Sequence, residues 1–199
     1  MENSLISPYV TERIRRFDGT LIGVCHSAPF MLSAQRDNRC VNDSDIISLQ
    51  DQLPKPADLI VVPVTGNTLT HVLQCIENYS VLQKENVRLA INYASLQQGG
   101  TVLRDAAQHF SFWLYDIAPP GMEWKNMADF PFDGIVLTDE FFSDNYLKFS
   151  FPFLLASLRE REAEIILRTP QLALPEHSYS DLQLTGWQQQ RTSSQLLEG

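Results

Sequence analysis

From residue 58 onward, the chain is built on short runs dominated by apolar residues. Strands with one wet face alternate apolar and polar side chains, whereas strands buried on both faces lose that alternation. Helical or loop segments separate successive runs, which is typical of a parallel sheet covered by helices. The runs are DLIVVPV (58–64), VRLAI (87–91), FSFWLYDI (110–117), FDGIVLTD (132–139) and EIILR (164–168), with LQLTG (182–186) as a candidate last strand.

The first strands are of a different kind. The stretch TERIRRFDGTLIGVCHS (11–27) has two apolar-alternating arms around Asp18-Gly19, a strong turn dipeptide, and predicts a β-hairpin. Residues 31–57 are polar and can hold only a short helix near 44–53. So many strands, alternating with helical or loop segments, predict an α/β fold and favour a barrel over an open sheet. Helices are expected within 67–82, 101–108 and 151–164.

Composition and charge restrict the function classes. The chain has 199 residues, 44% of them hydrophobic, and a formal net charge of −9. So acidic a protein repels phosphate backbones, and we expect no direct nucleic-acid binding. The basic run ERIRR (12–16) is interpreted as a solvated strand edge. The cysteines, Cys25, Cys40 and Cys75, form no CxxC pair, and no apolar run approaches ~18 residues, so we expect a cytoplasmic protein without a membrane segment.

Several strand endings resemble those of EAL domains, which hydrolyse cyclic di-GMP on a modified TIM barrel. VRLAINY is similar to the family's L-E-I-T-E strand, and FSFWLYDIAPPG to A-L-D-D-F-G-T-G. The most specific match is FPFDGIVLTDEFF (130–142), which resembles L-P-V-D-G-L-K-I-D-R-S-F. The resemblance implies an incomplete or modified TIM-like (EAL-type) barrel with reduced outer helices. It assigns residues 1–187 to a degenerate EAL-like domain and residues 188–199 to a polar C-terminal tail.

The EAL reaction needs carboxylates and an Asn at strand ends to hold two divalent cations, and a Lys near the attacking water. Among the positions that the resemblance assigns to these groups, only Asp116 is still a carboxylate, and Arg168 reverses a charge. One carboxylate cannot offset the repulsion between two close cations. The resemblance therefore implies no catalytic, metal-binding or cofactor-binding residues and no turnover of cyclic di-GMP. The positions are Cys25, Pro63, Ala90, Tyr115, Asp116, Val136, Arg168 and Thr185.

A small, catalytically degenerate EAL-like chain resembles the anti-FlhDC regulators of flagella in enteric bacteria. This resemblance implies a non-enzymatic repressor that binds the FlhD subunit of the master activator FlhDC and keeps it from promoter DNA. An inactive sensor that binds cyclic di-GMP is the alternative, although the lost ligands argue against binding. A residual phosphodiesterase with altered metal use is a more remote one.

The loop APPGMEWKNMADF (118–130) is the candidate surface for a protein partner. Met122, Trp124 and Met127 would suit such a surface if they were exposed. The alternative is that they pack onto the barrel. Adjacent strand residues such as Cys25 and His26 point to opposite faces, so they are not expected to form a nucleophile pair.

Overall fold

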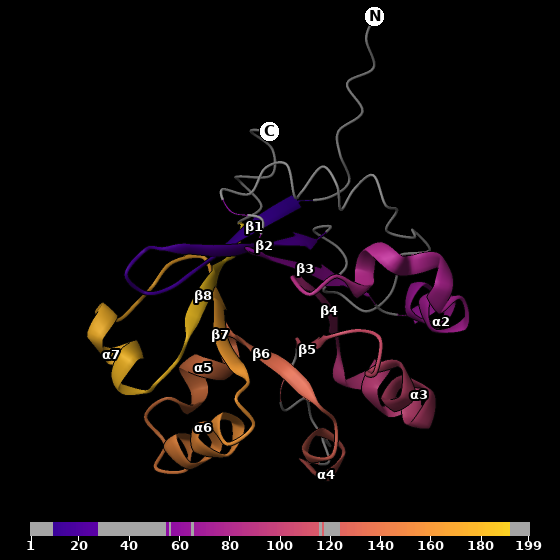
Figure 1. Cartoon of the computed structure of the whole chain (residues 1–199). Coiled ribbons are helices and arrows are strands. Elements are labelled where there is room, and N and C mark those ends of the chain that lie inside the picture. Colours follow the sequence, from indigo (N-terminus) through magenta and orange to yellow (C-terminus); the bar gives the residue numbers. More distant parts are fainter. Residues whose placement is uncertain are drawn as a thin grey trace, which may run out of the picture.

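The computed structural model describes residues 10–27, 55, 57–64, 66–115, 117 and 124–191. Eight strands form a closed barrel in chain order, and the first strand pairs with the last (Figure 1). β1 runs antiparallel to both neighbours, and every other neighbouring pair is parallel. The α/β barrel expected from the sequence is therefore confirmed. The ring of strands is complete, so of the two expected forms, incomplete or modified, the structure has the modified barrel.

The strands alternate with helices after the first hairpin. The strands are β1 (Val10–Arg15), β2 (Leu21–Ser27), β3 (Leu59–Pro63), β4 (Val87–Ile91), β5 (Phe112–Leu114), β6 (Phe132–Thr138), β7 (Glu164–Thr169) and β8 (Gly186–Gln189). The described helices are α2 (Gly66–Gln74), the 3-10 segment η1 (Ile76–Gln83), α3 (Tyr93–Ala106), α4 (Trp124–Ala128), α5 (Asp139–Asn145), α6 (Phe151–Arg159) and α7 (Glu176–Asp181). Figure 1 shows α2 to α7 outside the ring of strands.

The predicted hairpin is formed by β1 and β2. Gly19 in the turn has φ +88°, a conformation that glycine adopts without strain. Asp18 accepts a hydrogen bond from the Thr20 backbone N–H at 2.8 Å, which closes the turn locally. Asp18-Gly19 therefore forms the turn of the hairpin, as the sequence predicted.

Two apolar cores explain the unbroken apolar runs. One lies between the strands and the helices, and the other fills the barrel. Successive residues of a strand point to opposite faces, so each strand from β3 to β7 contributes side chains to both cores. In β6, for example, Ile135 packs outward with the helices and Val136 packs inward. The inner core consists of Ile14, Cys25, Val61, Ala90, Trp113, Tyr115, Val136 and Ile166.

Two helix boundaries differ from those expected. α3 begins at Tyr93, well before residue 101, because Asn92 caps it by accepting a hydrogen bond from the Ser95 N–H at 2.8 Å. Gly100 (φ +49°) kinks this helix. α6 ends at Arg159, because the chain enters β7 at Glu164.

The last strand also differs. β8 spans Gly186–Gln189, so the prediction of a strand over 182–186 is wrong in position. Gln188 and Gln189 of the predicted tail belong to the sheet, and Gln188 is fully buried. The domain therefore extends beyond residue 187, and only residues 192–199 of the predicted tail lie outside the described residues. The helix predicted near 44–53 lies outside them as well. No helix of the described ranges has the length and apolar character needed to cross a membrane.

Candidate functional site

The carboxyl ends of the parallel strands meet at one rim of the barrel, where barrel enzymes place their functional groups. Several positions that the EAL resemblance assigns to catalysis lie there in the inner core. Cys25, Ala90 and Val136 are at most 1% exposed, and Tyr115 is 6% exposed. None of these buried side chains is a carboxylate, and Asp116 lies outside the described residues. Pro63 is also buried.

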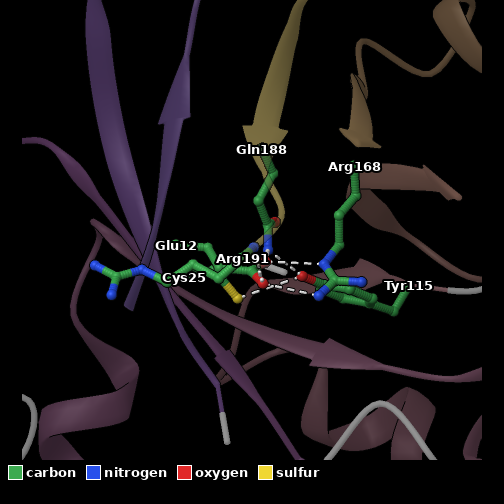
Figure 2. Close-up of polar contacts among 6 residues, drawn as sticks. All are labelled: Glu12, Cys25, Tyr115, Arg168, Gln188 and Arg191. Carbon is green, nitrogen blue, oxygen red and sulfur yellow. Dashed lines mark hydrogen bonds and ion pairs between the residues drawn. The ribbon is translucent and has the colours of Figure 1, made fainter. Parts of the chain in front are cut away.

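Arg168, near the end of β7, is the charged group at this rim. Its guanidinium donates two parallel hydrogen bonds to Glu12, from Nε to Oε2 and from Nη2 to Oε1, both at 2.8 Å (Figure 2). Glu12 is 4% exposed, and the Arg168 side chain is 16% exposed. A bidentate pair of this kind is the strongest geometry for an arginine and a carboxylate.

Further polar side chains surround the pair. Gln188 donates from Nε2 to Glu12 Oε2 at 2.6 Å and to the Tyr115 hydroxyl at 2.5 Å. The Tyr115 hydroxyl also lies 3.4 Å from the Cys25 sulfur. Figure 2 shows these groups converging inside the barrel from strands far apart in the sequence. We call Glu12, Cys25, Tyr115, Arg168 and Gln188 the rim network.

The direction of β1 explains why Glu12 reaches the rim. β1 is antiparallel to β2 and β8, so its first residues lie where the parallel strands end. The sequence interpretation of ERIRR as a solvated edge was wrong for Glu12. The sequence did contain a sign of this placement. Glu12 and Ile14 are two positions apart on one strand, so their side chains lie on the same face of the sheet. Gln188 was missed because it stands in a run of glutamines that looked like a solvated tail.

The environment of the rim network keeps Cys25, Tyr115 and Arg168 in their ordinary protonation states. Burial raises the pKa of the Cys25 thiol to about 12, and the charge of Glu12 adds to the effect. Burial also raises the pKa of Tyr115 well above its usual value. For Arg168, burial lowers the pKa, but the hydrogen bonds and charge of Glu12 outweigh it and the net shift is upward. At neutral pH the network therefore holds a thiol, a phenol and a guanidinium, none of which can act as a base.

Among the positions that the EAL resemblance assigns to the reaction, Thr185 differs because it does not lie at the rim. It precedes β8, so it lies at the end of the barrel opposite to the rim. There its hydroxyl accepts a hydrogen bond from the Ile165 N–H at 2.8 Å, and its carbonyl accepts one from Arg16 at 2.7 Å. Arg16 also forms an ion pair with Glu164 at 2.8 Å. The placement of Thr185 at the functional rim is therefore corrected.

The side chains at the rim do not fit the pair of divalent cations that EAL chemistry requires. Within the described ranges, no group of three or more His, Cys, Asp or Glu residues could hold a metal ion. Glu12, the carboxylate of the rim network, is already neutralised by Arg168. A guanidinium at this place would repel a cation rather than bind it. No step of a metal-dependent reaction can therefore be assigned to these residues.

No protein-family model and no curated protein matches the sequence. Solved structures do match it over nearly its whole length. The EAL-like domain protein YdiV superposes with a TM-score of 0.63 at 18% identity, over 90% of this chain and 89% of that one. The fold is that of an EAL domain. The PaMucR phosphodiesterase in complex with c-di-GMP gives a TM-score of 0.63 at 12% identity, over 91% and 93% of the two chains.

A third neighbour belongs to a longer protein. The Bacillus subtilis YkuI protein, solved with c-di-GMP and calcium, has a TM-score of 0.64 at 10% identity over 92% of this chain. This chain spans 55% of YkuI, about half its length. The structural neighbours therefore include a phosphodiesterase, PaMucR, as well as YdiV, and they establish the fold.

The candidate partner-binding residues are not brought together on a described surface. Met127 is 4% exposed and packs in the outer core, which is the alternative that the sequence left open for it. Trp124 begins α4, and Met122 lies outside the described residues. A partner-binding role for Met122 and Trp124 stays a prediction.

Proposed function

We propose that this chain is a non-enzymatic regulator that binds the FlhD subunit of the flagellar activator FlhDC. By holding FlhD, it prevents FlhDC from binding promoter DNA and represses flagellar genes and motility. The single observation that supports the non-enzymatic part is the Glu12–Arg168 pair. It fills the rim of an EAL fold with a neutralised, buried ion pair.

The choice of partner has two supports. The chain resembles anti-FlhDC regulators in its short, ligand-poor EAL pattern, and its fold is similar to that of YdiV. A net charge of −9 also suits a protein that competes with DNA for a transcription factor, because the DNA-binding face of such a factor is basic. Repulsion between this chain and DNA would keep the two from sharing one surface.

Co-purification and a promoter gel-shift test the proposal together. Tagged chain is passed over a column with purified FlhDC, and the same preparation is added to FlhDC on promoter DNA. We expect FlhD to co-elute and the shifted band to disappear as the chain is added. FlhC alone is the matched control and should not be retained. A shift that persists at saturating chain, with no FlhD in the eluate, would rule the proposal out.

A second candidate is an inactive sensor that binds cyclic di-GMP. The neighbours solved with that ligand favour it, since the same fold carries c-di-GMP in PaMucR and YkuI. Calorimetric titration with cyclic di-GMP distinguishes the candidates. Saturable heat at one site would favour the sensor, whereas FlhD binding without such heat would favour the regulator.

A further inference from the structure

Three large apolar side chains are exposed together around the start of α6. Leu147 is 83% exposed, Phe149 is 86% exposed and Phe153 is 63% exposed. The rings of Phe149 and Phe153 lie 5.3 Å apart and pack on each other. We call these three residues the α6 patch. The other large apolar side chain exposed among the described residues is Val102, on α3.

The patch is not a by-product of core packing. α6 already buries Phe151, Leu155 and Leu158 against the outer core. Phe149 and Phe153 are therefore additional to the apolar face that holds the helix in place. At these exposures, two phenylalanines offer on the order of 300 Å² of apolar surface. An apolar patch of that size on a protein surface often marks an interaction site.

The charges around the patch indicate what it can bind. Between residues 139 and 162, Lys148 is the exposed basic side chain, and it is hydrogen-bonded to Asn145. Arg159 and Arg161 are half-buried and donate to backbone carbonyls. The exposed acidic side chains of the same segment are Asp139, Glu140, Asp144, Glu160 and Glu162. The patch is therefore set in a predominantly acidic segment.

These charges disfavour the other occupants of an apolar patch. A second copy would bring the same acidic segment and another net charge of −9. An anionic membrane or a nucleic acid would be repelled in the same way. A protein with an apolar centre and a basic edge would gain both burial and charge complementarity.

We infer that the α6 patch is the docking surface for a protein partner whose contact face is apolar at its centre and basic at its edge. The inference rests on the proposed function insofar as it takes FlhD as that partner. It adds the location, since Leu147, Phe149 and Phe153 lie outside the loop that the sequence had suggested. The aromatic pair would form the buried centre of an interface that extends beyond it.

The test compares the natural chain with F149S/F153S and with the control V102S. Both variants replace exposed apolar side chains by serine, so both should fold, which circular dichroism and thermal unfolding verify. In calorimetry with purified FlhDC, we expect F149S/F153S to bind about tenfold or more weakly and V102S to bind like the natural chain. Equal binding by all three would overturn the α6 patch while leaving the proposed function intact.

If the natural chain does not bind FlhDC, the proposed function fails, and a model peptide then tests the patch. The probe is an amphipathic Leu-Lys helix, with a Leu-Glu helix of the same pattern as control. Binding of the Leu-Lys helix alone, lost in F149S/F153S and kept in V102S, would support the patch. Equal binding of both peptides, or binding that the variant retains, would overturn it.

Two further measurements address the disfavoured occupants. Sedimentation should show the same monomer for the natural chain and F149S/F153S, and neither should pellet with phosphatidylglycerol vesicles. Dimerisation or vesicle binding that the double substitution removes would overturn the inference.

Discussion

Arg168 shows how a single residue can change what a barrel rim does. The EAL resemblance places a carboxylate at this position, but here the guanidinium is held by two hydrogen bonds to Glu12. The Arg168 side chain thereby joins β7 to β1 inside the barrel through a buried ion pair.

The first prediction concerns this pair. Arg168→Met should lower the free energy of unfolding by about 3–5 kcal/mol, because it leaves the Glu12 carboxylate buried without its counter-charge. The double variant E12L/R168M should be far less affected, since two apolar side chains of similar size replace the whole pair. Urea unfolding of the single and double variants measures both. A double variant no more stable than R168M would show that the carboxylate was not the source of the loss.

The second prediction concerns thiol reactivity. Cys25 is fully buried with a pKa of about 12, so at pH 8 on the order of one thiol in 10⁴ is ionised. Cys75 is only half-buried. In a C40S background, iodoacetamide should modify Cys75 readily and Cys25 only after urea unfolds the chain, as peptide mass spectrometry will show. Comparable rates in the native protein would mean that the barrel opens at β2.

At the scale of elements, the barrel interior leaves no room for a side chain at Gly134. A Cβ added to Gly134 on β6 would lie 2.5 Å from the ring of Trp113, which is fully buried on β5. Gly134→Ala should therefore lower the free energy of unfolding by about 1–3 kcal/mol, the usual cost of overpacking a core. In a W113L background, where the ring is gone, the same substitution should cost much less. Equal costs in the two backgrounds, measured by urea unfolding, would contradict the contact.

The opposite end of the barrel has an ion pair that joins the β1–β2 turn to β7. Burial raises the pKa of Glu164, but hydrogen bonds from Arg16 and Thr185 and the charge of Arg16 outweigh it, so the net shift is downward. A lowered folded pKa means that the carboxylate stabilises the fold above its unfolded pKa, near 4.5, and that this contribution disappears as pH falls through the folded pKa.

The fourth prediction follows from that sign. When the pH is lowered from neutral to 3, the Glu164→Gln variant should lose less free energy of unfolding than the natural chain. The difference should be under about 1 kcal/mol, because the Arg16 side chain is 40% exposed and water screens the pair. Thermal unfolding across this pH range measures it, with the exposed Glu160→Gln as control. A steeper acid loss in E164Q would mean that the carboxylate does not stabilise the fold.

The elements also show what the sequence could and could not predict. Strands β3 to β7 were recognisable because burial on both faces leaves an unbroken apolar run. β8 was not recognisable, because Gln188 belongs to a polar network inside the barrel, whereas a glutamine in the sequence alone suggests a solvent-exposed position. Residue types alone show that most positions assigned to metal ligands by the EAL resemblance carry no carboxylate. The rim network could not be predicted, because its hydrogen bonds join residues far apart in the sequence. Arg168 lies 156 positions from Glu12, and Gln188 lies 176 positions from it.

For the whole molecule, the structure separates two regions of different character. At the rim, Glu12 and Arg168 are buried and paired with each other, whereas the α6 patch is apolar and exposed on the outside. Binding free energy is available where surface is still hydrated, and at the rim the side chains of Glu12 and Arg168 already satisfy each other. This contrast between the two regions supports the proposal that the chain contacts another protein through its outer surface.

The last prediction tests this division with the intact chain. A ligand that binds only the folded state at 100 times its dissociation constant raises stability by about 2.7 kcal/mol, which for a domain of this size moves the unfolding temperature by roughly 5–10 °C. We expect Mn²⁺ and cyclic di-GMP, alone or together, to leave the unfolding temperature of this chain unchanged in a thermal-shift assay. The PaMucR phosphodiesterase, solved with c-di-GMP, serves as positive control. A rise for this chain that grows with ligand concentration would show that the rim still binds, and would favour the sensor over the regulator.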